Sequence, residues 1–205
     1  MVLRVDGKAG GLVMTLPKRT GLAEALRFAQ ASSSWITGQL EKRVPTFTMA
    51  TGAEILLRGE PHRIVVLPAK RGLVICDQGT LQVPGGEIHA ARRLRDELKK
   101  RAMAELTLAS HRYAQAMATV FSAIVVRDQK SRWGSCSASG TLSYSWRLIL
   151  APPFVLDYVA AHEVAHLREM NHGPRFWRLV LTHCPNAKAA KQWLKQNGRQ
   201  IHNYL

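Results

Sequence analysis

The sequence predicts an α+β fold in which a small antiparallel sheet packs beside a helix, with a β-rich region preceding both. Short apolar runs separated by Gly and Pro dominate about the first eighty residues, which is typical of strands joined by hairpin turns. Residues 88–119 contain neither Gly nor Pro and are rich in Ala, Leu, Lys and Arg, so they predict a long helix or a pair of helices. Strand-like runs then return between Phe121 and Leu150.

The change of pattern near residue 88 also predicts the domain organisation. The chain has 205 residues, of which 46% are hydrophobic, and this suits one globular domain, alone or with an N-terminal extension. We predict a β-rich N-terminal region over residues 1–87 and a second domain over residues 88–205, and we expect no internal repeat. No apolar run is long enough to span a membrane, and the first residues, MVLRVDGKAGG, lack a secretory signal. We therefore expect a cytoplasmic protein without a membrane partner.

Three N-terminal segments predict strands: GGLVMTLP, EILLRGEPHRIVVLP and GLVICDQGTLQVPGGE. Between the first and the second, residues 21–40 carry apolar side chains at helical spacing, so we expect one helix there. Farther along the chain, AIVVRD and GTLSYSWRLIL predict strands around QKSRWGSCSAS, whose small and polar residues suit a hairpin turn.

The next predicted helix follows the tripeptide APP. Pro153 suits a first-turn position, because that position needs no backbone hydrogen-bond donor. The spacing of four, three and four residues along Val155, Val159, His162 and His166 places these side chains on one stripe of the helix. We therefore expect both histidines to face inward with the apolar side chains.

The segment HEVAHLREMNH combines three histidines with an acidic residue next to the first of them. Neutral imidazole is a good zinc ligand, and a catalytic zinc site typically has three protein ligands and an open fourth position. The pattern predicts a Zn²⁺ ion held by His162, His166 and His172. Glu163 is then the catalytic acid/base, which takes a proton from a metal-activated water and passes it to a leaving amine.

The third histidine requires the chain to turn back beyond the helix. Asn171 is the best candidate for a left-handed conformation in this turn, and Gly173 and Pro174 would then begin a new helix, PRFWRLVLTHC. Glu169 could orient a ligand imidazole or be an ordinary surface residue. We expect Tyr158 to be a packing residue.

The segment from Ser131 to Trp177 resembles the YgjP-like metallopeptidase family, whose relatives include the SprT-like minimal zinc proteases. The similarity lies in the motifs R-W-G-S-C, W-R-L-I-L-A-P-P, Y-V-x-x-H-E-x-x-H and N-H followed by F-W. It implies a zincin-like metallopeptidase domain over residues 88–205, with the same three histidines on zinc and Glu163 as acid/base. Some members of this family have been linked to hydrolysis of nucleoside triphosphates to the monophosphate and pyrophosphate.

Three functions are compatible with these observations. We favour peptide-bond hydrolysis, because TLSYSWRLIL could supply an edge strand for an extended peptide or protein substrate. The first rival is a zinc hydrolase of a phosphorylated small molecule, similar to a nucleoside triphosphate pyrophosphatase. A cleft lined with Arg or Lys would favour this rival, whereas an open groove beside an exposed strand would favour a peptide. The second rival is a protease module associated with nucleic acid, which a salt-sensitive affinity for DNA would favour.

The charge distribution is the reason for considering nucleic acid. The formal net charge is +15, and no acidic residue follows Glu169. On a helix, Lys188, Lys191, Lys195 and Arg199 would form one stripe, which is either a solvated face or a surface for weak nucleic-acid binding. The three cysteines lack C-x-x-C spacing and indicate neither a disulfide framework nor a thiolate zinc site. No sequence feature predicts the oligomeric state.

Overall fold

The computed structural model describes residues 1–5, 11–41, 49–68, 71–129 and 131–204. The chain forms two compact units, Met1–Thr46 and Phe47–Leu205, which we call the N-terminal unit and the C-terminal unit and describe separately. Among the described residues, no helix is both long enough and apolar enough to cross a membrane.

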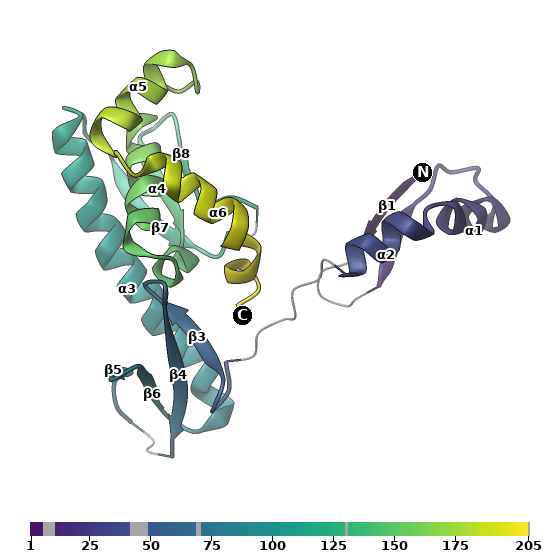
Figure 1. Cartoon of the computed structure of the whole chain (residues 1–205), viewed down its shortest axis with the longest axis horizontal. Helices are drawn as coiled ribbons and strands as arrows, with labels where there is room; N and C mark the ends of the chain where they lie inside the picture. Colours follow the sequence, from purple (N-terminus) through teal and green to yellow (C-terminus); the bar gives the residue numbers. More distant parts are fainter. Residues whose placement is uncertain (6–10, 42–48, 69–70, 130, 205) are drawn as a thin grey trace. The chain divides into compact units, whose positions relative to one another are not determined.

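The N-terminal unit combines a two-stranded sheet with two helices (Figure 1). Its strands are antiparallel and its elements are β1 (Val2–Val5), β2 (Leu12–Thr15), α1 (Leu22–Ala31) and α2 (Ser33–Glu41). The prediction of one helix over residues 21–40 was therefore wrong in one respect, because the helix is interrupted at Ser32. Three consecutive serines follow Ala31, and serine side chains compete with the backbone for hydrogen bonds, which favours a helix end.

The C-terminal unit contains two small sheets and a group of helices. Its elements are β3 (Glu54–Leu57), β4 (Glu60–Leu67), β5 (Ile75–Asp77), β6 (Thr80–Pro84), α3 (Glu87–Ala116), β7 (Ala123–Arg127), β8 (Gly134–Cys136), β9 (Thr141–Ser145), the 3₁₀ helix η1 (Trp146–Leu150), α4 (Pro153–Ala165), α5 (Pro174–His183) and α6 (Ala187–His202). This mixture of small sheets and helices confirms the predicted α+β class. The domain boundary predicted at residue 88 coincides with the start of α3, but it lies inside the C-terminal unit.

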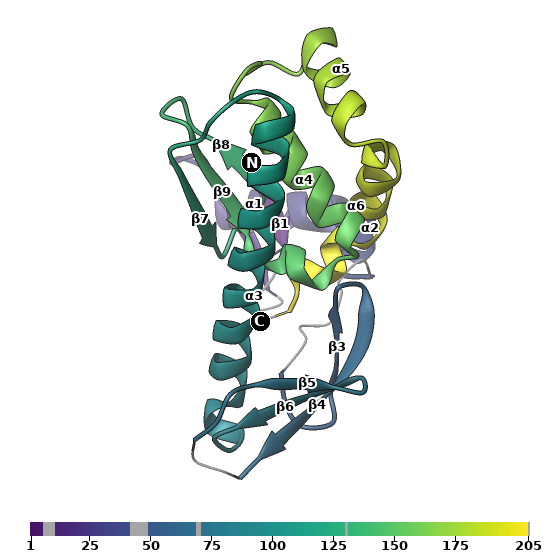
Figure 2. The same ribbon diagram turned by 90° about the vertical axis from the view of Figure 1, so that its left-hand side faces the viewer.

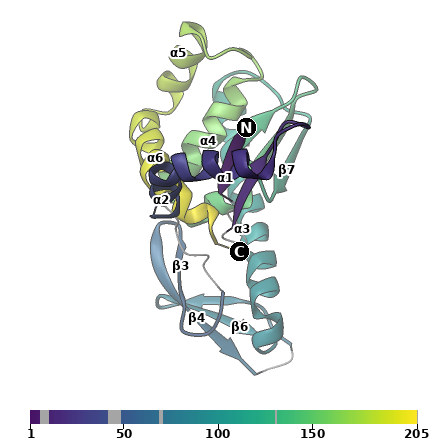
Figure 3. The same cartoon turned by 90° about the vertical axis from the view of Figure 1, so that its right-hand side faces the viewer.

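Helix α3 runs along most of the C-terminal unit, with the sheet of β3, β4, β6 and β5 near its start and the sheet of β7, β9 and β8 near its end (Figure 2). Helices α4, α5 and α6 are grouped at the same end as the second sheet (Figure 3). The long helix predicted for residues 88–119 is confirmed. Its buried side chains recur at every fourth position, as expected for a helix that packs along one face: Ala90, Leu94, Leu98, Ala102 and Leu106.

The sheet beside the helices differs from the prediction in two ways. It is mixed rather than antiparallel, because β8 and β9 form an antiparallel hairpin while β7 pairs with β9 in parallel. Strand β9 is therefore the central strand, and the edge strand expected from TLSYSWRLIL was wrong. The strand ends at Ser145, whose side chain accepts a hydrogen bond from the backbone N–H of Arg147 and starts η1. All five residues of η1 are buried.

The two sheets share a three-strand motif, contrary to the expectation of no internal repeat. The first motif consists of β4, β5 and β6, and the second consists of β7, β8 and β9. In each motif the first strand is followed by an antiparallel hairpin, and the second strand of this hairpin pairs in parallel with the first strand of the motif. The pairing register also agrees, because Ile64 lies opposite Leu81 in the first motif and Ile124 lies opposite Leu142 in the second. Both leucines are fully buried.

The sequences of the two motifs match at the positions that set this register. Each begins with Ile-Val-Val, has a cysteine twelve residues after that isoleucine, and has Gly-Thr-Leu at the start of its last strand. The cysteines, Cys76 and Cys136, pair with the equivalent leucines of β6 and β9. The second hairpin has one more residue between cysteine and leucine, so the repeat is short and interrupted.

Candidate metal centre

Helix α4 carries the first part of the site. It begins at Pro153, as predicted, and its second and third turns are buried almost all round, which is typical of a helix packed inside a domain. Near its start Asp157 accepts a hydrogen bond of 2.7 Å from the guanidinium of Arg112 on α3. On the predicted stripe Val155 and Val159 are buried, and both His162 and His166 are partly buried.

The structure brings the three histidines together. One ring nitrogen from each of His162, His166 and His172 lies within 4.8 Å of the others. The Nε2 atoms of His162 and His172 are 2.9 Å apart. Within the described part of the chain, this is the only cluster of three or more His, Cys, Asp or Glu side chains with converging ligand atoms.

The turn that returns the third histidine is different from the predicted one. Asn171 is not left-handed, because the only described residues other than glycine with positive φ are Arg58, Gln78 and Ala118. Instead, the Gly173 N–H donates to the Asn171 carbonyl over 2.7 Å, which makes a tight turn centred on His172. Helix α5 then begins at Pro174, as predicted.

The donor set fits a divalent metal ion that prefers nitrogen. Burial lowers the pKa of His162 to about 3 and also lowers the pKa of His166, so both imidazoles are neutral at neutral pH and keep a lone pair for a metal. The Nδ1 atom of His166 lies 3.1 Å from the Glu169 carbonyl oxygen. An Nδ1–H donor in this contact leaves Nε2 as the ligand atom, so Glu169 orients the ring through its backbone rather than through its carboxylate.

Glu163 lies beside the first histidine and is buried, with 5% of its surface exposed. Burial raises the pKa of its carboxyl to about 8, while the charge of Arg132 acts in the opposite direction. The residue facing it is Gly134 on β8. A Cβ atom on Gly134 would lie 2.6 Å from Oε1 of Glu163, so no larger residue fits without moving the carboxylate. Sequence reasoning missed this glycine, because the contact joins segments that are far apart in the chain.

Aromatic rings from α5 pack around the histidines. The ring of Phe176 is fully buried, with its centroid 4.6 Å from those of His166 and His172 and 4.8 Å from that of His162. Trp177 lies 5.9 Å from His162 and from His172, measured between ring centroids. These rings limit the movement of the imidazoles. In the sequence these two rings are the F-W pair after N-H, but their packing against the histidines depends on where α5 begins.

A cavity of about 360 Å³ opens next to Glu163 and His162. Three elements supply its walls: Arg132, Trp133 and Gly134 at β8, Tyr158 and Val159 on α4, and Lys191 and Leu194 on α6. Tyr158 therefore both packs in the core and faces the cavity.

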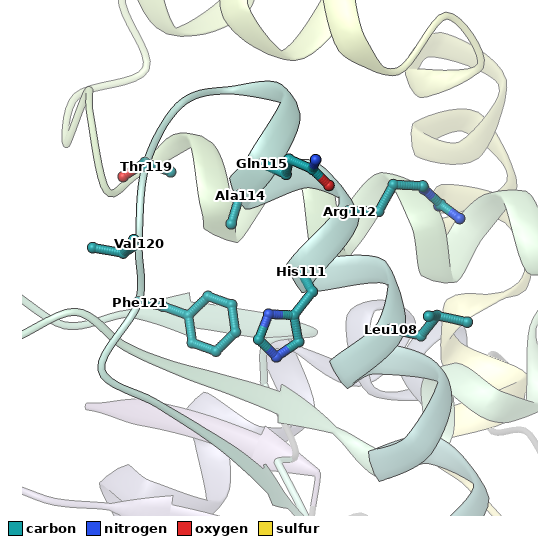
Figure 4. A pocket seen from close by; sticks show the side chains of 8 residues that line it. All are labelled: Leu108, His111, Arg112, Ala114, Gln115, Thr119, Val120 and Phe121. Carbon is teal, nitrogen blue, oxygen red and sulfur yellow. The ribbon is translucent and has the colours of Figure 1, made fainter.

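A larger cavity, of about 640 Å³, lies elsewhere, at the end of α3 (Figure 4). His111 and Phe121 face each other there, with ring centroids 4.8 Å apart. None of the residues that line it belongs to the histidine cluster. We therefore identify the functional site by its chemistry rather than by the size of the cavity.

Comparison with known proteins gives one result that covers nearly the whole chain. The family model described as YgjP-like, metallopeptidase domain, matches residues 1–197. This range includes the whole N-terminal unit, the C-terminal unit up to residue 197, and every residue of the histidine cluster. No match to a curated protein was found.

Proposed function

The chain belongs to the YgjP-like metallopeptidase family, and on this premise we propose that it is a zinc-dependent peptidase with Glu163 as its general base. Membership by itself implies a metal-dependent hydrolase that acts as a peptidase. The observation that carries the finer proposal is the convergence of three imidazoles beside one buried carboxylate.

His162, His166 and His172 would hold the metal ion. Three imidazoles that leave a further position open are a donor set that suits a catalytic zinc. When bound, Zn²⁺ supplies Lewis-acid chemistry, because it polarises a carbonyl group and lowers the pKa of a water molecule. The backbone of Glu169 and the ring of Phe176 keep His166 in the orientation that this requires.

Glu163 moves the proton in this mechanism. Its carboxylate takes a proton from the attacking water and delivers it to the amine of the leaving peptide fragment. Burial raises the pKa of Glu163 to about 8, which favours the protonated carboxyl that gives the proton to the amine. Gly134 leaves the space in which this carboxylate sits.

The substrate would bind along β8 rather than along the strand predicted from the sequence. Trp133 accepts a hydrogen bond from Ser145 N–H over 2.9 Å, and Ser137 N–H donates to Thr141 over 3.0 Å. Because such bonds alternate along an antiparallel pair, the backbone groups of Gly134 and Cys136 point away from β9. An extended peptide can pair with these groups beside Glu163.

One observation favours a second candidate function. Arg132 and Lys191 line the cavity, and cations there suit a phosphorylated small molecule as well as an acidic peptide. We rank the peptide first because of the family and the free edge of β8. A cytoplasmic location stays a prediction.

The test is the variant Glu163→Gln, which keeps the shape of the side chain and removes the base. We expect peptide hydrolysis by the zinc-loaded protein to fall by about 10²- to 10⁴-fold, while zinc content measured by metal analysis is unchanged. Glu169→Gln is the matched control, because only the backbone of Glu169 contacts the site. Full activity of Glu163→Gln would contradict the general-base role.

A further inference from the structure

The catalytic cavity contains two cations that the proposed peptide chemistry does not use. Arg132, at the start of the β8 hairpin, and Lys191, on α6, both line the cavity and are exposed. Among the described residues, neither of them forms an ion pair with a carboxylate. The ammonium of Lys191 lies 4.8 Å from the ring centroid of Trp177, and this contact keeps it near the histidines.

The two cations come from different elements. Arg132 precedes β8 and Lys191 lies on α6, and both line the same cavity as Glu163 and His162. Both charges therefore lie beside the groups proposed for catalysis. Glu163 is the only acidic residue among those that line the cavity.

The rest of the lining is largely apolar. Besides the two cations and the catalytic groups, the cavity is lined by Trp133, Tyr158, Val159 and Leu194. Such a lining accommodates the methylene groups of a side chain, while the cations provide partners for an anionic end. A fully hydrated polyanion would gain little from these apolar walls.

We propose that Arg132 and Lys191 form a specificity site for a substrate carboxylate close to the scissile bond. The carboxylate belongs to an acidic side chain or to the C-terminus of the peptide. This inference rests on the proposed peptidase function and adds the substrate class. The free edge of β8 binds the peptide backbone, and the two cations select the peptide by charge.

Binding to the catalytically silent variant Glu163→Gln tests the selection without hydrolysis. The probes are fluorescein-labelled peptides, acetylated and amidated, that differ only in one Glu, Gln or Lys residue. A fourth probe is the Gln peptide with a free C-terminal carboxylate. We expect the best carboxylate-bearing probe to bind about tenfold more tightly than the amidated Gln peptide, which corresponds to about 1.4 kcal/mol. The probe that binds more tightly identifies the source of the carboxylate.

Charge reversal of the cavity lysine provides the decisive comparison. In the Glu163→Gln background, we expect Lys191→Glu to abolish the tenfold preference and to favour the Lys peptide. Lys188→Glu makes the same charge change one turn away on α6, where the side chain is exposed and does not line the cavity, and should keep the preference. Arg132→Gln should reduce the preference without disturbing the contact with Trp177.

Two results would overturn the proposal. One is equal binding of all four peptides; tight binding of inorganic triphosphate in that case would favour the phosphate candidate. The other is a preference that Lys191→Glu and Lys188→Glu reduce equally, which would reflect net charge alone. Hydrolysis of the same peptides by the unmodified protein is a separate measurement. Selective binding without hydrolysis would contradict the peptidase function and leave the carboxylate site standing.

Discussion

The two three-strand motifs of the C-terminal unit have the same strand order and register, but only the second forms part of the candidate active site. Where the second motif has Gly134, two residues before its cysteine, the first motif has Val74. Strand β5 of the first motif is exposed along its length, whereas β8 is half-buried and packs against α4. The two motifs therefore differ in the helix that packs against the hairpin, α4, and in the side chain that is missing at Gly134.

This comparison shows that the strand framework does not create the site. Ile64 and Ile124 occupy the same register position, and both belong to or pack against the hydrophobic core. The proposed function depends on the absence of a side chain at Gly134, which leaves room for Glu163. The residues before this glycine, Arg132 and Trp133, line the cavity, and their counterparts in the first motif are Gly72 and Leu73.

The largest effect should come from the three proposed metal ligands, which lie beside the second motif. We expect His172→Ala to weaken zinc binding by more than 100-fold, because loss of a ligand costs more than loss of a residue that orients one. Competition with a chromophoric chelator measures this affinity. His62→Ala, in β4 of the first motif, is the matched control and should bind zinc normally. Unchanged affinity of His172→Ala would remove it from the ligand set.

The second prediction exchanges the residue that distinguishes the motifs. Gly134→Val introduces the residue found in the first motif, and we expect hydrolysis to fall by about 10²-fold or more because Glu163 is displaced. Overpacking should also lower the free energy of unfolding by about 1–3 kcal/mol. Steady-state kinetics and urea denaturation measure the two effects.

The reciprocal variant is the control for this exchange. We expect Val74→Gly to lower the free energy of unfolding by a similar amount while hydrolysis is retained. If Gly134→Val is as active as the unmodified protein, the position of Glu163 does not depend on the missing side chain.

The third prediction compares the equivalent cysteines. Cys76 is exposed, whereas burial and the charge of Glu163 raise the pKa of the Cys136 thiol, which leaves less thiolate at neutral pH. We expect iodoacetamide to label Cys76 about tenfold faster than Cys136 at pH 7, as followed by peptide mass spectrometry. Because its pKa is raised, labelling of Cys136 should accelerate at a higher pH. Faster labelling of Cys136 at pH 7 would contradict the packing of β8 against α4.

The smallest effect concerns α6, which packs against α4 beside the second motif. If its exposed stripe of Lys188, Lys191, Lys195 and Arg199 contacts DNA phosphates, the slope of log affinity against log salt should be about −3.6 on duplex DNA. The double variant Lys188→Glu, Lys195→Glu should lower that slope by roughly half. A fluorescent duplex titrated at several salt concentrations provides the measurement.

The control for α6 uses exposed cations beside the first motif. The double variant Arg92→Glu, Lys100→Glu on α3 makes the same change in net charge and should leave the slope unchanged. Equal slopes for both double variants, or no binding at low salt, would leave α6 as a solvated face.

Elements with a strong local pattern were predictable from the sequence. The absence of Gly and Pro over residues 88–119 predicted α3, and Pro153 marked the start of α4. The spacing of the histidines predicted that they converge, and the structure shows this convergence. That they bind zinc, and that Glu163 acts as base, stay predictions.

The sequence by itself therefore determined the long helix, the start of the helix that carries the histidines and the family, because these depend on patterns within single segments. Only the tertiary structure decided that β9 is central, that Gly134 faces Glu163 and that Lys191 reaches the cavity. Those contacts depend on strand register and on the packing of segments distant in the chain. Periodicity along one segment does not contain this information, because it specifies which side of an element is buried but not which element covers it.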